Sequence, residues 1–203
     1  MLEVVDLECV RGDRPLFSHL TFRLNPGELL HVTGANGSGK TTLLRTLCGL
    51  THAATGEVRW QGSTIHELGD DYLSQLSYIG HSNGIQGELT LEENLRTAVC
   101  LSGGTNTTLI AKTLVRLGLV AYRHFPAKIL SQGQKRRLAL ARLEVQQKPL
   151  WILDEPLSAL DVNSVALMTE ILIEHLARDG LIIMTSHQDV AVETKTILQI
   201  QLD

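Results

Sequence analysis

The sequence predicts an α/β protein in which a run of helices interrupts a β-rich core. Two β-like stretches, at residues 2–10 and 16–24, open the chain. A short apolar strand, a glycine-rich loop and a helix follow between residues 28 and 50, and strand and helix patterns return from residue 150 onward. We therefore expect an antiparallel β part at the front of the chain and a mixed or parallel sheet in the core.

The glycine-rich loop matches the phosphate-binding pattern G-x-x-x-x-G-K-[ST]. Its strand is expected at Glu28–Thr33, and its helix carries leucines at positions 43, 44, 47 and 50. Backbone N–H groups of such a loop surround an anion, and the helix N-terminus adds its positive dipole end. Lys40 is expected to reach the β- and γ-phosphates, and Thr41 to ligate Mg²⁺. The sequence thus predicts a site for a nucleoside triphosphate, formed by Gly34, Ala35, Asn36, Gly37, Ser38, Gly39, Lys40, Thr41 and Thr42.

Composition narrows the choice of partners. A net charge of −4 and 4% aromatic residues give no electrostatic or stacking reason to expect nucleic acid. The cysteines Cys9, Cys48 and Cys100 show no C-x-x-C spacing, which favours idle thiols in a reducing compartment. No stretch approaches about 18 apolar residues, and the N-terminus lacks the features of a signal peptide. We expect a cytoplasmic protein that reaches a membrane only through a partner.

The middle and end of the chain predict further elements. A core strand is expected at residues 77–80, and amphipathic helices are expected near 90–99 and 109–117. Apolar strands are expected at 150–154, 181–184 and 196–202, with a helix at 163–178. We interpret residues 1–203 as one domain. Its core comprises 1–83 and 149–203, and a helical subdomain with its own small core covers 84–148.

Two carboxylates follow the apolar strand at 150–153. Asp154 can hold Mg²⁺ directly or through water, and Glu155 can polarise a water aimed at the γ-phosphate. Alone, this pair would fit an acidic turn at a strand end equally well. Beside a phosphate-binding loop, the catalytic interpretation is favoured.

A second motif lies at Leu130-Ser131-Gln132-Gly133-Gln134, at the start of a long predicted helix. A hydroxyl, free N–H groups and a helix dipole there suit a phosphate, although an N-cap with a basic first turn is the alternative. The stretch resembles the LSGGQ signature of the ATP-binding cassette (ABC) ATPases, with Gln132 in place of the first glycine. The resemblance implies the P-loop NTPase fold of ABC ATPases with its helical subdomain. It also implies a dimer in which Ser131, Gln132, Gly133 and Gln134 complete the ATP site of a second subunit.

Further family elements follow in the family's order. Ser158–Asp161 resembles the D-loop, and His187 resembles the switch histidine that contacts the γ-phosphate and positions Glu155. Two positions depart from the family pattern. Arg11 stands where an aromatic residue usually stacks on adenine, and a guanidinium plane can also stack on a base. His81 stands where the Q-loop glutamine is expected, and a neutral imidazole could contact the water shell of the metal.

The stretch from Gly80 to Leu95, with Trp60-Gln61-Gly62, is similar to the ATPase subunits of cytochrome c maturation systems. This resemblance implies a peripheral subunit on the cytoplasmic side of the bacterial inner membrane. It implies an integral membrane partner and a second ATPase copy, and we expect the groove between the Q-loop and the helical insert to contact the membrane partner. ATP hydrolysis, with Mg²⁺ and with Glu155, His187 and Lys40 as catalytic residues, would drive haem export or haem release from a chaperone.

Other functions stay open at this point. The chain could be the ATPase of an ABC transporter with another cargo. It could also be an ABC-type ATPase acting on nucleic acid or ribosomes, although the interval between P-loop and signature holds no sustained heptads. A small-molecule kinase with a helical lid is a third possibility, but it gives the motifs at 130–134 and 187 no role.

Overall fold

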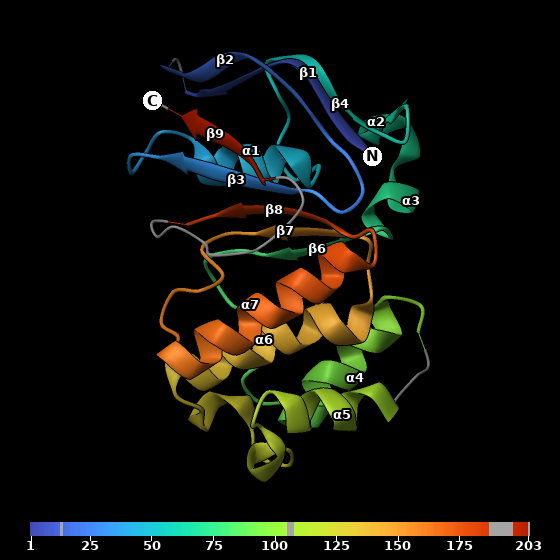
Figure 1. The fold of residues 1–203 in the computed structure, drawn as a ribbon, viewed down its shortest axis with the longest axis vertical. Coiled ribbons are helices and arrows are strands. Elements are labelled where there is room, and N and C mark those ends of the chain that lie inside the picture. Colours follow the sequence, from blue (N-terminus) through green and yellow to red (C-terminus); the bar gives the residue numbers. More distant parts are fainter. Residues whose placement is uncertain (13, 105–107, 187–196, 203) are drawn as a thin grey trace.

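Two β-sheets and a layer of helices make up the protein (Figure 1), described here from a computed structural model covering residues 1–12, 14–104, 108–186 and 197–202. The first sheet is antiparallel, with the order β2-β1-β4-β5. Its strands are β1 (Leu2–Arg11), β2 (Arg14–Leu24), β4 (Thr55–Trp60) and β5 (Ser63–Thr64). The second sheet is parallel throughout, with the order β6-β7-β8-β3-β9. Its strands are β6 (Leu76–Ile79), β7 (Leu150–Leu153), β8 (Leu181–Thr185), β3 (Leu29–Gly34) and β9 (Ile197–Leu202).

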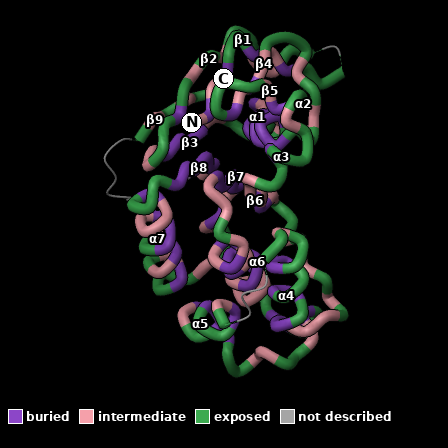
Figure 2. The backbone as a smooth tube through the Cα atoms, turned by 90° about the vertical axis from the view of Figure 1, so that its right-hand side faces the viewer, coloured by how far each residue is buried: buried purple, intermediate pink, exposed green. Residues whose placement is uncertain are grey.

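The central strands of the parallel sheet are apolar on both faces. In β7, Leu150 and Ile152 belong to the apolar cluster between the two sheets, whereas Trp151 and Leu153 belong to the cluster under the helices. Strand β8 alternates in the same way. Because successive side chains point to opposite faces, a strand covered on both sides is a continuous apolar run. Figure 2 shows the resulting concentration of buried residues in β3, β7, β8 and α1.

Helix α1 (Lys40–Leu47) fills the space between the two sheets (Figure 1). Its leucines Leu43, Leu44 and Leu47 are fully buried in the cluster that also holds side chains of β1 and β3. Two short helices, α2 (Ile65–Leu68) and α3 (Asp70–Leu73), lie beyond β5 and were not predicted from the sequence. The hydroxyl of Tyr72 donates a hydrogen bond to Leu47 O at 2.5 Å, and this bond links α3 to the C-terminal end of α1.

Four longer helices lie on the other face of the parallel sheet (Figure 1). They are α4 (Leu91–Leu101), α5 (Thr108–Arg116), α6 (Gln132–Gln146) and α7 (Val162–Ala177), with 3₁₀ turns η1 (Val120–Tyr122) and η2 (Ala127–Ile129). Leu95 of α4 and Leu138 of α6 belong to one cluster with Trp151 and Met184 of the sheet. The expectation of a separate small core for residues 84–148 is therefore wrong, because this apolar cluster is continuous with the sheet. The proposed division of the chain into core and subdomain stays a prediction.

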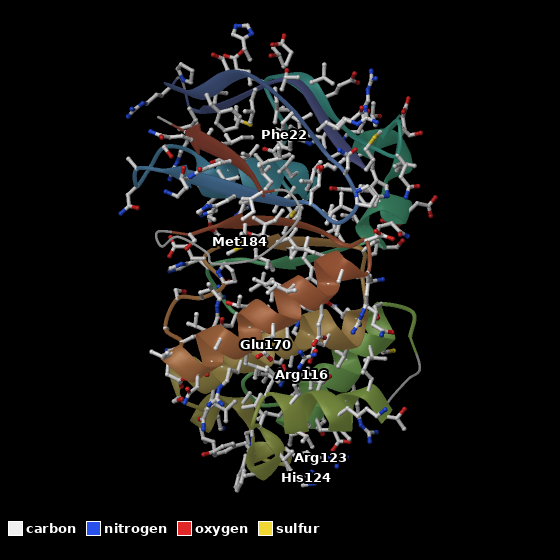
Figure 3. The ribbon with its side chains drawn as sticks, viewed as in Figure 1. Phe22, Arg116, Arg123, His124, Glu170 and Met184 are labelled. Atoms are coloured by element: carbon white, nitrogen blue, oxygen red, sulfur yellow. The ribbon has the colours of Figure 1, made fainter. Side chains whose placement is uncertain are left out.

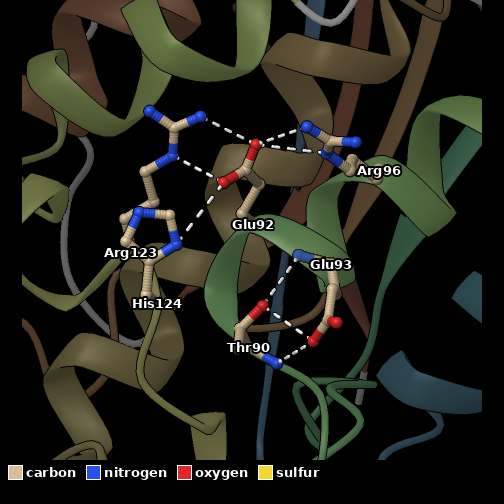
Figure 4. Close-up of polar contacts among 6 residues, drawn as sticks. All are labelled: Thr90, Glu92, Glu93, Arg96, Arg123 and His124. Atoms are coloured by element: carbon tan, nitrogen blue, oxygen red, sulfur yellow. Dashed lines mark hydrogen bonds and ion pairs between the residues drawn. The ribbon is translucent and has the colours of Figure 1, made fainter.

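An ionic cluster lies at the end of the helical layer far from the antiparallel sheet (Figure 3), and its contacts are drawn in Figure 4. Thr90 and Glu93 form a reciprocal capping box that starts α4. The largely buried Glu92 accepts hydrogen bonds from Arg123 at 2.6 and 2.8 Å and from Arg96 at 2.8 and 3.1 Å. The hydrogen bonds from Arg123, and then from Arg96, lower the pKa of Glu92 to about 2. The cluster thus joins α4 to the segment before η2.

Candidate nucleotide-binding site

The phosphate-binding loop runs from the end of β3 into α1. Helix α1 begins after Gly39, which has a φ of 102° and provides no side-chain cap to the helix N–H groups. The first N–H groups of a helix have no partner within the helix, so this end of α1 suits an anion. Lys40 is 9% exposed, and its ammonium donates to the carbonyl oxygens of Gly34 at 2.7 Å and Ala35 at 2.9 Å. The loop therefore carries a positive charge on its inner side.

Ser38 supplies an independent sign of an anionic ligand. Its hydroxyl oxygen is buried and has no hydrogen-bond partner among the described residues. A buried hydroxyl left without a partner costs free energy, and native structures rarely keep one without a reason. A phosphate oxygen at the loop would accept a hydrogen bond from it. The donor set of the loop thus fits a phosphate group.

Thr41 and Asp154 meet at the carboxyl edge of the parallel sheet. Thr41 Oγ1 donates to Asp154 Oδ2 at 2.8 Å, and Thr185 Oγ1 donates to Asp154 Oδ1 at 2.7 Å. Asp154 is 5% exposed, and its backbone N–H donates to Ile79 O at 2.7 Å, beside the end of β6. Carboxyl ends of neighbouring parallel strands share one edge, which is why residues far apart in sequence converge here.

The oxygen atoms of Thr41 and Asp154 fit Mg²⁺, which prefers oxygen ligands. Within the described part of the chain, no group of three His, Cys, Asp or Glu side chains could hold a metal ion by itself. Mg²⁺ is usually held by one or two carboxylates together with phosphate oxygens and water. The donor set is therefore suited to a metal that arrives with a nucleotide.

Glu155 follows in a left-handed backbone conformation, with a φ of 48°. Its N–H donates to Thr185 Oγ1 at 2.9 Å, and its carbonyl oxygen accepts from Arg136 Nη2 at 2.6 Å. Sequence reasoning assigned neither Thr185 nor Arg136 to the site. The only sequence signals were the polar end of the strand before His187 and the basic run after Gln134.

A cleft of about 290 Å³ is lined by half of the predicted site residues. It brings Arg11, at the exposed end of β1, next to the phosphate-binding loop and the two carboxylates. The cleft is lined by Arg11, Leu16, Asn36, Gly37, Gly39, Lys40, Thr41, Thr42, Asp154 and Glu155. Arg11 thus lines the same cleft as the phosphate-binding loop.

The predicted residue His81 and the nearby Gln86 both follow β6, and neither of them lines the cleft. His81 is exposed in the segment after β6, and it is not among the residues that line the cleft. Gln86 is directed to α4 instead, because its N–H donates to Asn94 Oδ1 at 2.9 Å and its carbonyl accepts from Asn94 Nδ2 at 3.0 Å. His187 lies outside the described residues.

The signature residues start helix α6 and do not line the cleft of their own chain. Ser131 Oγ accepts from the N–H of Gln134 at 3.2 Å, and Gln134 Oε1 accepts from the N–H of Ser131 at 2.9 Å. Ser131 and Gln132 are exposed, and Gly133 lies against the carbonyl of Ala159. A phosphate that reached this helix end would have to come from outside the chain.

The pattern of the family described as ABC transporter matches residues 17–158. The chain belongs to the ABC transporter family. It is 50% identical to the cytochrome c biogenesis ATP-binding export protein CcmA of Nitrosomonas europaea, with 97% of this chain and 93% of the relative covered. It is 48% identical to the protein of that name in Nitrosospira multiformis, with 99% and 98% covered.

A solved structure of the ATP-binding subunit of an ABC transporter superposes with a TM-score of 0.84 at 27% identity, covering 92% of this chain and 80% of that one. The ABC ATPase fold predicted from the sequence is therefore confirmed. As an ABC ATPase, the chain binds nucleotide. Among the helices of the described residues, none has the length and apolar character needed to cross a bilayer.

Proposed function

We propose that this ABC ATPase binds and hydrolyses ATP to drive a membrane complex of cytochrome c biogenesis from the cytoplasmic side of a bacterial inner membrane. The observation that carries hydrolysis is the contact of Thr41 with Asp154 beside the phosphate-binding loop. The biological setting is supported by the names of relatives that are 48–50% identical over nearly the whole chain. The cargo, haem or another, is part of the proposal that experiment must decide.

Phosphate binding falls to the loop and the start of α1. Residues 34–42 offer backbone N–H groups, the charge of Lys40 and the Ser38 hydroxyl, which has no partner among the described residues, to the β- and γ-phosphates. Arg11 stacks on the adenine, in line with its place on the rim of the cleft. Tight ATP binding that is indifferent to Arg11→Ala would remove that contact from the proposal.

The reaction itself needs positioning and charge stabilisation. Thr41 and Asp154 would hold Mg²⁺, which would supply positive charge to stabilise the negative charge that develops on the phosphate oxygens. Glu155 orients the attacking water and accepts its proton at the carboxylate, and His187 contacts the γ-phosphate. His81 takes the place of the family's Q-loop glutamine. Phosphoryl transfer to water needs no covalent bond to the protein.

Two copies of the chain face each other in this proposal. Ser131, Gln132, Gly133 and Gln134 of one copy complete the nucleotide site of the other, which is supported by the exposure of Ser131 and Gln132 and by the absence of all four from the cleft of their own chain. An integral membrane subunit docks over a cavity of about 450 Å³ that includes Asn83, Ile85 and Lys128. The cavity borders the segment after β6, so docking could reach the site through that segment.

Two experiments test the proposal. Purified Glu155→Gln protein is expected to bind ATP, to lose steady-state turnover and to sediment as a nucleotide-bound dimer. Undiminished turnover in that variant would remove Glu155 from its role. Co-purification from solubilised membranes, followed by mass spectrometry, is expected to recover cytochrome-maturation membrane proteins. Recovery of a sugar or metal permease, or of ribosomes, would overturn the proposed setting.

A further inference from the structure

All of the N–H donors of the Arg136 guanidinium group form hydrogen bonds, and the group lies next to the backbone of Asp154 and Glu155. The side chain starts from the second turn of α6 and is 3% exposed. A guanidinium group has five N–H donors, and the structure gives five hydrogen bonds to oxygen atoms. Nε donates to Pro156 O at 3.1 Å, Nη2 to Asp154 O at 2.9 Å and Glu155 O at 2.6 Å, and Nη1 to Asn83 Oδ1 at 3.1 Å and Gly80 O at 3.3 Å.

Burying this guanidinium group costs more free energy than burying an apolar side chain of similar volume. Four of the five acceptors are backbone carbonyls, and among the described residues no carboxylate forms an ion pair with Arg136 within 4.0 Å. Burying a cation without such a partner is expensive. Burial lowers the pKa of Arg136, and the charges of Asp154 and Glu155 act in the opposite direction. The buried charge of Arg136 therefore lies next to the backbone of the two acidic residues, whose carbonyl oxygens it contacts.

The backbone held by Arg136 has an unusual conformation. Glu155 has a φ of 48°, and a residue with a Cβ pays about 1–2 kcal/mol in this left-handed region. Its carbonyl oxygen accepts from Arg136 and from the N–H and hydroxyl of Ser158, while its N–H donates to Thr185. These contacts fix the peptide groups on both sides of the Glu155 Cα. The direction of the Glu155 Cα–Cβ bond follows from them.

We propose that Arg136 is a positioning residue for ATP hydrolysis, which holds the backbone of Glu155 and ties it to the segment at Gly80 and Asn83. The proposal rests on the function proposed above, in which Glu155 orients the attacking water. One rigid fork spans residues 80–83 and 154–156, so a displacement of the first segment is transmitted to the second. A lysine has three donors on one flexible stem and cannot span both segments.

A second arginine of the same helix provides a matched control. Arg142 Nη1 donates to Asn83 O at 3.2 Å and Gly84 O at 3.0 Å, and burial lowers its pKa as well. No hydrogen bond joins it to residues 154–156 in the described structure. Replacing Arg142 therefore removes a partly buried guanidinium that contacts the same segment, and it leaves the contacts of Arg136 with the Glu155 backbone in place.

The experiment compares Arg136→Met, Arg136→Lys and Arg142→Met in the full-length protein. For each, kcat and KM for ATP hydrolysis are measured, together with the affinity for a fluorescent ATP analogue and the melting temperature. A catalytic group displaced by about 1 Å can lose roughly a hundredfold in rate. We expect kcat to fall about ten- to a hundredfold in both Arg136 variants with KM within about twofold, and Arg142→Met to keep kcat within about threefold.

The outcomes separate the inference from the function on which it rests. Folded Arg136→Lys protein that keeps wild-type kcat would overturn the positioning role, whatever Arg136→Met does to folding. An equal fall of kcat in Arg142→Met would also overturn it, because general loosening of the segment would then explain the effect. Glu155→Gln is measured in parallel. If that variant retains turnover, the proposed role of Glu155 fails, whereas its loss with unaffected Arg136 variants defeats only this inference.

Discussion

Thr41 Oγ1 donates a hydrogen bond to Asp154 Oδ2 at 2.8 Å, across a separation of 113 positions in the sequence. The contact joins the start of α1 to the residue that follows β7. It forms because β3 and β7 are both parallel strands of one sheet, separated only by β8. Two oxygen groups that suit Mg²⁺ are thus close together within the folded chain. Less reorganisation is then needed when a metal–nucleotide complex binds.

Thr185→Val is expected to impair hydrolysis more than nucleotide binding. Thr185 is fully buried, and its hydroxyl donates to Asp154 Oδ1 and accepts from the N–H of Glu155. Valine has nearly the same shape, but it leaves a buried acceptor and a buried donor without a partner, at about 1–3 kcal/mol. We expect a melting temperature lower by several degrees and a kcat reduced about tenfold or more.

Thr185→Ser provides the control for this prediction. Serine keeps the hydroxyl and loses only a methyl group, which costs about 1 kcal/mol in a buried position. Turnover close to wild type is expected at a temperature where both variants are folded. If the valine variant hydrolyses ATP as fast as the serine variant, the hydroxyl of Thr185 has no part in placing Asp154 and Glu155.

Gly34→Ala is expected to prevent stable folding around the phosphate-binding loop. Gly34 has a φ of 146°, and a Cβ there would collide with the carbonyl oxygen of Leu202 at the end of β9. Gly37→Ala in the same loop meets nothing within 4 Å and bears only the conformational cost of its φ of 86°, about 1 kcal/mol. Thermal unfolding without nucleotide should show a much larger loss for Gly34→Ala. Equal losses would mean that contact with β9 does not decide the stability of the loop.

Much of the fold and part of the site followed from local patterns. Strands β7 and β8 were predicted because four or more consecutive apolar residues end in polar ones, and the structure buries both faces. The loop at Gly34–Thr42 was predicted because strand, glycine loop and helix are neighbours in the chain. Boundaries were the weaker part, since α1 ends at Leu47, before Leu50, and β1 extends one residue beyond position 10 to Arg11. Patterns that act within a few residues are visible in one sequence.

The parts that were missed depend on contacts between distant segments. Arg136 had no local signal beyond a basic run, because its acceptors come from residues 80–83 and 154–156. The supposed separate core of residues 84–148 was wrong for the same reason. Amphipathic periodicity shows that α4 and α6 have an apolar face, but it does not reveal that this face packs on the same cluster as Trp151.

Stability is expected to fall as the pH drops from about 6.5 toward 4 because of His175. Its ring stacks on Trp151 with centroids 3.7 Å apart. Burial lowers the pKa of His175 to about 4. The charge of Arg178 also lowers this pKa, whereas the backbone of Pro149 and Leu181 raises it. In this pH window the unfolded chain binds a proton that the folded chain excludes, so folding weakens as the pH falls. The full effect is roughly 3 kcal/mol at about 1.4 kcal/mol per pH unit.

Denaturant unfolding of wild type and His175→Phe between pH 4 and 7.5 tests this expectation. Phenylalanine keeps an aromatic ring against Trp151 and cannot be protonated. The unfolding free energy of the wild type should therefore fall relative to that of His175→Phe as the pH falls. The nearby Glu144 has a pKa raised by burial, and its contribution has the opposite sign in an overlapping window. Both proteins retain Glu144, so the comparison isolates the histidine. Parallel pH profiles would show that His175 is not the group responsible.

A mixture of two inactive variants is expected to recover activity if each nucleotide site is shared between two copies. Lys40→Ala removes the charge of the loop, and Ser131→Arg blocks the exposed helix start that does not line the cleft of its own chain. In a mixed dimer, both lesions fall in one site and the other site is intact. Random pairing makes half of the dimers mixed, so turnover of about a quarter of wild type is expected if intact sites act independently.

Exchange of subunits is verified by energy transfer between labelled copies. A mixture that exchanges subunits but hydrolyses no more ATP than either variant alone would show that one chain does not complete the site of another.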